Sequence, residues 1–184
     1  MSRLVIASIG PASSVQDGGR PGSQRYGLTP SGAMDRLALA AANTLVGNPL
    51  FAAAVEVGPF GAAFTARGGA VRIALTGASR SADVGGLAVA LGTSTTLADG
   101  ETLTLGLARG GSFSYLAIEG SFVGEPMFGS LAVNARAGLG SPYPRPLQAG
   151  DLHRPGRSGR KPHAAGTVRV DKAASVGELL VQRR

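Results

Sequence analysis

The chain has 184 residues, of which 43% are hydrophobic and 16% are charged, and it contains no cysteine. This length and apolar content fit one folded domain, while the lack of cysteine excludes disulfides, thiol nucleophiles and thiolate metal sites. No apolar run approaches the roughly 18 residues of a membrane span, and no signal segment opens the chain, so we expect a cytoplasmic protein without a membrane partner.

The net charge of +7 is concentrated at the C-terminal end. Residues 154–184 hold eight basic residues against two acidic ones, whereas residues 1–153 hold ten against nine. A nucleic-acid-binding domain would instead spread its basic residues over one folded face, so we expect no nucleic-acid partner. We predict a domain over residues 1–153, a basic Pro- and Gly-rich linker over 154–166, and a short, poorly ordered tail over 167–184.

The first predicted elements are one strand and one helix, separated by a long irregular segment. An apolar run at residues 4–6 begins the strand, which Gly10 and Pro11 end. Residues 16–32 contain too many glycines and prolines to be regular. Apolar residues at helical spacing predict a helix from about residue 34 to residue 45, with Ser31 as its cap and Gly47 as its stop.

The sequence after the predicted helix indicates a series of short strands. Apolar or alternating segments occur at 54–57, 62–65, 71–75, 87–91, 94–97, 102–105 and 114–118, with glycine-rich turns between them. Asp99-Gly100 suits a hairpin turn between two of these strands, because glycine tolerates the positive φ that such turns require. Many short strands with a single helix predict a mostly β barrel or sandwich.

Polar motifs are densest between residues 13 and 58. They include Gln16-Asp17-Gly18-Gly19-Arg20, Ser31-Gly32-Ala33-Met34-Asp35, Asn43-Thr44-Leu45-Val46-Gly47-Asn48, and Glu56. Glycine lets a backbone turn sharply or approach a ligand, and polar side chains on such loops are typical of a binding surface.

These motifs, in this order and at this spacing, resemble the start of the biotin-dependent carboxyltransferase family, also called the allophanate hydrolase subunit 2 family. That family includes the C-type subunit of the bacterial 5-oxoprolinase and the carboxyltransferase domain of urea carboxylase. The likeness extends to about residue 153 and covers only the N-terminal half of a family member. It implies a cyclophilin-like β-barrel half of a carboxyltransferase domain. Where the family carries Gly-Ser-x-Ser-Thr, this chain has Gly129-Ser130-Leu131-Ala132-Val133.

The candidate substrate-binding residues are polar groups and glycines of these motifs, with one aromatic residue and one later arginine. They are Gln16, Asp17, Arg20, Tyr26, Ser31, Gly32, Asp35, Asn43, Asn48, Glu56 and Arg136.

Their expected roles differ. Arg20 either orients a carboxylate or carbonyl oxygen while Asp17 holds the loop, or forms a simple ion-pair clasp with Asp17. Ser31 and Asp35 lie at the predicted helix start, where N–H groups attract anions and where capping also explains both residues.

We expect Asn43 to tie down a neighbouring loop. If Glu56 is buried, it needs a partner, and Arg20 or Arg136 is the natural one.

Several other chemistries lack the residues that they need. His153 and His163 are the only histidines and lie at or beyond the end of the body, so neither a His-based triad nor a metal site is predicted. Both lysines, Lys161 and Lys172, lie in the tail, and no phosphate loop or Met-Lys-Met biotinylation site is present. Any biotin would therefore arrive on another chain or domain.

The resemblance implies three functions. The first is ATP-dependent hydrolysis of 5-oxoproline to L-glutamate, as part of a heteromer with A-type and B-type companion subunits and with ATP as a co-substrate of the complex. The second is carboxyl transfer from carboxybiotin, carried by a partner, to a urea-like amide. The third is a non-catalytic regulator that binds a kinase-inhibitor companion. For either enzymatic function, a second half-domain or self-association would complete the cleft.

Overall fold

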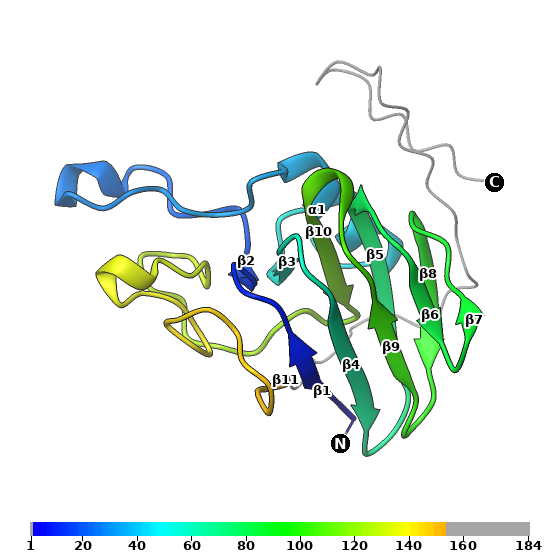
Figure 1. Cartoon of the computed structure of the whole chain (residues 1–184). Coiled ribbons are helices and arrows are strands. Elements are labelled where there is room, and N and C mark those ends of the chain that lie inside the picture. The colour runs from blue at the N-terminus through cyan, green and yellow to red at the C-terminus, as the bar shows by residue number, and fades with distance from the viewer. Residues whose placement is uncertain (1, 154–184) are drawn as a thin grey trace.

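The computed structural model describes residues 2–153, which form two antiparallel β-sheets around one core, with one α-helix among the described elements (Figure 1). The helices are α1 (Arg36–Leu45) and the short 3₁₀ helices η1 (Ser23–Tyr26) and η2 (Ala135–Ala137). The strands are β1 (Arg3–Ile9), β2 (Ser14–Gln16), β3 (Ala54–Val57), β4 (Ala62–Arg67), β5 (Val71–Ser79), β6 (Ala82–Val84), β7 (Leu87–Ala88), β8 (Thr93–Leu97), β9 (Thr102–Leu105), β10 (Arg109–Ile118) and β11 (Leu152–His153). The predicted linker and tail lie outside the described residues.

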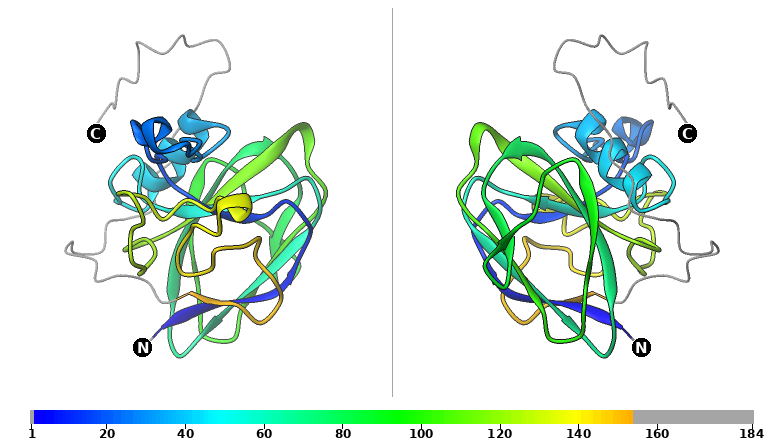
Figure 2. Two further views of the ribbon diagram at one scale, coloured as in Figure 1. Left: turned by 90° about the vertical axis from the view of Figure 1, so that its left-hand side faces the viewer. Right: turned by 90° about the vertical axis from the view of Figure 1, so that its right-hand side faces the viewer.

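The strands of the two sheets follow the orders β11-β1-β4-β9-β6-β7 and β2-β3-β10-β5-β8. The sheets curve around a shared interior (Figure 2), which Leu4, Ile6, Phe64, Leu103 and Leu116 fill as fully buried side chains. The predicted class, mostly β with one helix, is confirmed. No helix among residues 2–153 is both long and apolar enough to cross a membrane.

Helix α1 covers the outer face of the second sheet. Leu39 and Ala42 of the helix pack with Ala74 of β5 and with Tyr115 and Ala117 of β10. The inner face of the same strands faces the main core, so every residue of β3 is buried. This double coverage explains why β3 and the end of β10 are continuously buried, whereas β8 and β9 alternate.

The start of α1 differs from the prediction. Asp35 is its cap, and its side chain accepts a hydrogen bond from the Ala38 N–H group at 2.9 Å. Ser31, the predicted cap, lies four residues earlier with a left-handed φ of 54°, and its hydroxyl lies 3.5 Å from that of Thr29. Ser31 therefore shapes the approach to the helix and does not cap it.

Two strand predictions were also wrong. The segment 87–91 is extended only at Leu87–Ala88, while β2, β6 and β11 were not anticipated. Asp99-Gly100 is a turn, but β8 pairs with β5 and β9 pairs with β4 and β6, so the turn passes from one sheet to the other. The expected hairpin does not form.

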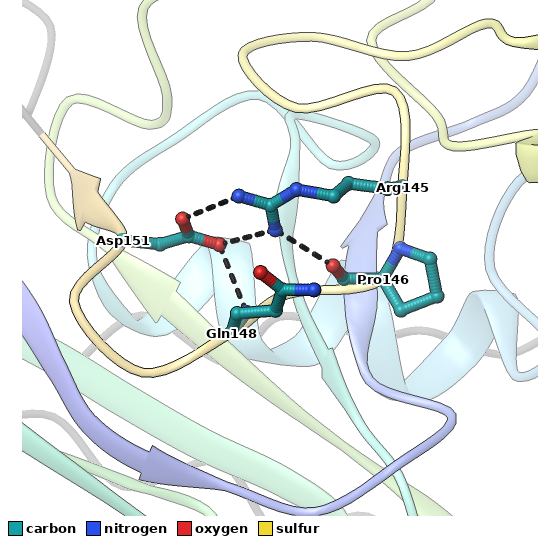
Figure 3. A network of polar contacts seen from close by, with 4 residues as sticks. All are labelled: Arg145, Pro146, Gln148 and Asp151. Carbon is teal, nitrogen blue, oxygen red and sulfur yellow. Dashed lines mark hydrogen bonds and ion pairs between the residues drawn. The ribbon is translucent and has the colours of Figure 1, made fainter.

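A polar clasp sets the position of β11 (Figure 3). Arg145 donates two hydrogen bonds to the carboxylate of Asp151, at 2.8 and 2.9 Å, and Asp151 also accepts one from the Gln148 N–H group at 2.9 Å. The hydrogen bonds to Asp151 raise the pKa of Arg145. The Asp151 carbonyl accepts a bond from the Ile6 N–H group, which brings β11 to the edge of β1.

Candidate functional site

Two loop segments lie on the same side of the sheets and carry most of the candidate residues (Figures 1 and 2). We call residues 17–33, which include η1, the first arm, and residues 123–140, which include η2, the second arm. At their base, Gln16 donates to the Val133 carbonyl, and the Val133 N–H group donates to the Val15 carbonyl. Strand β2 thus connects the two arms.

Asp17 is the hub that joins the arms. One carboxylate oxygen accepts hydrogen bonds from the Gly19 N–H group at 2.7 Å and from the Ser130 hydroxyl at 2.6 Å. The other accepts the Leu131 N–H group at 2.7 Å. Because all of these contacts hold loops, Asp17 has the structural role that was expected for it.

Arg20 is buried between the arms, with 1% of its surface exposed. Its Nη2 donates to the Ala132 carbonyl, and its Nε lies 3.4 Å from the Met127 carbonyl. Burial lowers the pKa of Arg20, and the nearby charge of Asp17 acts in the opposite direction. No ion pair joins Arg20 to Asp17 in the described structure, so the simple clasp is wrong.

The motifs around Gly19 and Gly32 meet at a crossing of backbones. Gln16 accepts a hydrogen bond from the Gly32 N–H group at 3.1 Å, and the Asp17 carbonyl accepts one from the Ala33 N–H group at 3.0 Å. These bonds hold residues 31–33 against the start of the first arm. The role of Gln16 and Gly32 in the structure is therefore to position the backbone that leads into α1.

Glu56 and Tyr115 bind the backbone N–H groups of the next two residues, Met34 and Asp35. The Met34 N–H group and the Tyr115 hydroxyl both donate to one oxygen of Glu56, at 2.9 and 2.7 Å, and the Asp35 N–H group donates to the Tyr115 oxygen at 2.7 Å. Four successive N–H groups, from Gly32 to Asp35, are thus bound within the protein. These four groups precede α1, and none of them is free to bind an anion.

The expected partner of Glu56 was wrong. Glu56 is buried, but it contacts Tyr115 and Met34, while Arg136 is exposed on η2 and Arg20 lies between the arms. Burial raises the pKa of Glu56, and its two hydrogen bonds partly oppose that rise. Burial also raises the pKa of Tyr115 above its ordinary value of 10.

Asn43 and Asn48 tie the end of α1 to its surroundings. Asn43 donates to the Leu50 and Ala52 carbonyls, which confirms its expected role as a loop tether. Asn48 donates to Asn43 and to the Ile118 carbonyl, and accepts a bond from the Gly120 N–H group. Both amides are therefore occupied by contacts within the protein.

Two of the exposed candidates, Tyr26 and Arg136, lie on the arms. Tyr26 is 59% exposed, and its ring centroid lies 5.8 Å from that of Phe128 on the second arm. The Arg25 guanidinium group stacks over Tyr26, and Asn134 donates to Thr29 across the arms at 3.0 Å. Tyr26, Arg136 and the half-buried Ser31 are thus the candidates on the arms with side chains that can meet a ligand without rearrangement, while Asp35, which is also exposed, caps α1 with its carboxylate.

Sequence reasoning did not single out Ser130, Tyr115 or Asn134 as contacts of the candidate residues. Ser130 carries a signal of its own, since it follows Gly129 at the position where the family has its hydroxyl-rich motif. Tyr115 and Asn134 carry no comparable signal. Among residues 2–153, no three His, Asp or Glu side chains gather closely enough to hold a metal ion.

Comparison with known proteins agrees with the resemblance. The family described as "Carboxyltransferase domain, subdomain A and B" matches residues 26–179. The chain is 37% identical over 159 residues to the C-type subunit of 5-oxoprolinase from Escherichia coli, covering 85% of this chain and 50% of that protein. It is 34% identical over 154 residues to a putative urea carboxylase of Emericella nidulans, covering 82% of this chain and 12% of that protein.

Among solved structures, one crystal structure of TTHA0988 superposes with a TM-score of 0.84 at 29% identity, over 93% of this chain and 34% of that chain. The chain spans about half the length of the 5-oxoprolinase relative that it matches. The residues that match the family include the second arm, helix α1 and nearly all strands of the two sheets. The chain belongs to the carboxyltransferase domain family, subdomains A and B.

Proposed function

We propose that this chain acts as part of the C-type subunit of an ATP-dependent 5-oxoprolinase, which hydrolyses 5-oxoproline to L-glutamate. The observation that carries the proposal is the 37% identity, over 85% of the chain, to a protein named as that subunit of 5-oxoprolinase. A-type and B-type companion subunits complete the enzyme, and ATP is a co-substrate of the complex. A second half-domain, or self-association, completes the cleft.

The arms offer chemistry suited to such a substrate. A lactam develops negative charge on its carbonyl oxygen when it is attacked, and preorganised donors stabilise that charge. Tyr26, Ser31 and Arg136 present hydroxyl and guanidinium donors on the exposed side of the arms. Asp17 and Gln16 keep the two arms fixed relative to each other, which holds these donors in place.

Carboxyl transfer to a urea-like amide is the second candidate, because a putative urea carboxylase is also a relative. The chain has no Met-Lys-Met biotinylation site, so another domain or a partner would carry the carboxybiotin in that reaction. Both reactions act on a planar amide, and the same donors on the arms serve either one.

Glutamate release separates the two candidates. The companion subunits are co-expressed with and without this chain, and ATP-dependent release of glutamate from 5-oxoproline is measured. We expect release to depend on the chain, and Arg136→Ala to lower kcat/KM about tenfold. Arg109→Ala, an exposed arginine at the start of β10, is the matched control. Equal release without the chain contradicts the proposal.

A further inference from the structure

One buried donor in the described structure has no acceptor. Among the described side chains, Nη1 of Arg20 is the buried nitrogen or oxygen atom without a hydrogen-bond partner. Arg80, the other deeply buried arginine, provides the contrast, because its Nε, Nη1 and Nη2 all donate to oxygen atoms of the protein. Buried polar groups in proteins are rarely left unbonded, and a free guanidinium nitrogen is therefore a candidate for a ligand contact.

The charge of Arg20 is also incompletely balanced. Its two hydrogen-bond acceptors are the carbonyls of Met127 and Ala132, which carry no net charge. Asp17 is close enough to influence Arg20, but its oxygens are taken by Gly19, Ser130 and Leu131. A buried cation without a bonded carboxylate favours the arrival of an anion.

A tight turn of the second arm contacts Arg20 through the Met127 carbonyl. Met127 and Ser130 exchange two backbone hydrogen bonds, and the residues between them, Phe128 and Gly129, have φ values of 52° and 76°. A bulky residue at positive φ is uncommon and strained. Phe128 is nevertheless 53% exposed, and its ring lies tilted against that of Tyr26. Displacement of this turn would break the contact of the Met127 carbonyl with the Arg20 guanidinium group.

From these contacts we infer that Arg20 binds a carboxylate group, which pairs with Nη1 beneath the turn of residues 127–130. This step rests on the proposed function: the bound group is the carboxylate of 5-oxoproline. Arg20 then fixes the substrate, and the lactam of the substrate faces the exposed donors of the arms. A guanidinium group suits this task because it binds carboxylates through parallel N–H donors.

Arginine side-chain NMR of the labelled chain tests the inference directly. Sodium acetate and 5-oxoproline are titrated separately, with sodium chloride at matched ionic strength and pyrrolidin-2-one, a lactam without a carboxylate, as controls. We expect saturable shifts of the Arg20 Nε and Nη signals with the two carboxylates and none with the controls. The Arg80 signals, in the same spectrum, stay fixed because each nitrogen of that group already donates within the protein. Unmoved Arg20 signals, or equal shifts with chloride, overturn the inference.

Kinetics of the assembled complex provide the second test. Arg20→Lys keeps the charge but loses the paired donors, so we expect KM for 5-oxoproline to rise about tenfold with a smaller change in kcat. Arg109→Lys is the control. If activity requires the chain but KM is unchanged in Arg20→Lys, the carboxylate contact is wrong and the proposed function stands. If activity does not require the chain, the acetate titration still decides the contact.

Discussion

Individual residues of the two glycine motifs are explained by a close approach of backbones. A Cβ atom on Gly32 would lie 2.8 Å from the Gly19 nitrogen, and one on Gly19 would lie 2.6 Å from the Ser31 carbonyl oxygen. Both glycines also have positive φ, at 93° and 80°. The motifs therefore need glycine for space as well as for conformation. The two glycines thus serve the backbone packing at the base of the first arm.

Gly32→Ala should destabilise the protein by on the order of 3 kcal/mol, since it adds a backbone clash to the strain of a positive φ. Gly27→Ala is the matched control: Gly27 has a φ of 76°, but a Cβ there meets nothing within 4 Å. We expect the control to lose about 1 kcal/mol. Urea denaturation measures both changes, and equal losses would show that the crossing of the motifs can accommodate a methyl group.

Glu56 should make stability depend on pH. Its folded pKa is raised, so the folded state binds the proton more tightly, and the free energy of unfolding falls as pH rises from the ordinary value of 4.5 toward the folded pKa. Glu56→Gln keeps an oxygen that accepts from Met34 and Tyr115 but has no charge to bury. We expect the variant to gain stability relative to the native chain across this window, by about 1.4 kcal/mol for every pH unit between the ordinary pKa and the raised one. Urea denaturation from pH 4 to pH 8 measures the difference in the free energy of unfolding between the variant and the native chain. A difference that stays constant over this range would contradict the prediction.

At the scale of elements, the beginning of α1 depends on Asp35. The Asp35 side chain accepts a hydrogen bond from the Ala38 N–H group, and the Asp35 N–H group donates to the Tyr115 hydroxyl oxygen. Asp35→Ala removes the first contact and leaves the second, so we expect a loss of about 1 kcal/mol. Asp35→Asn, which caps a helix nearly as well, should lose less than half as much. Thermal unfolding distinguishes the two variants, and identical melting temperatures would show that the cap contributes nothing to stability.

Local sequence patterns predicted the positions of the helix and strands better than the pairing of the strands. The strands at 54–57 and 102–105 and the helix end at residue 45 were placed correctly, because each follows from spacing and stop signals within a few residues. The Asp99-Gly100 turn was recognised, but its strands join different sheets. Pairing depends on residues far apart in the chain, which no local pattern reports. Ser31 was assigned wrongly for the same reason, since Glu56 and Tyr115 hold the intervening backbone out of the helix.

At the scale of the whole molecule, the motifs identified the candidate residues but not their tasks. Asp17 and Arg20 bond to residues 130–132, more than a hundred positions later in the sequence. The spacing of a motif cannot reveal such partners. The resulting division, with buried motif residues that fix the arms and exposed ones that face outward, is a property of the folded chain.

The two sheets are themselves joined at one end by Arg80, just after β5. Its Nη2 donates to the Gly58 carbonyl at 2.8 Å, its Nη1 to the carbonyls of Phe60 and Gly106 at 3.1 and 3.3 Å, and its Nε to the Ser114 hydroxyl at 2.9 Å. Gly58 follows β3 of the second sheet, and Gly106 follows β9 of the first. One buried side chain therefore satisfies carbonyls from both sheets.

Arg80→Met should be among the most destabilising single changes in the body, because it leaves several buried carbonyl groups without their charged donor. We expect a loss on the order of 3 kcal/mol in the free energy of unfolding. Arg109→Met, which removes an exposed arginine from the start of β10, should change stability by less than about 0.5 kcal/mol. Urea denaturation with both fluorescence and far-UV circular dichroism measures the loss and tests whether the sheets unfold together. A loss below about 1 kcal/mol for Arg80→Met would mean that the apolar core alone holds the two sheets, since the carbonyls would then have found other donors.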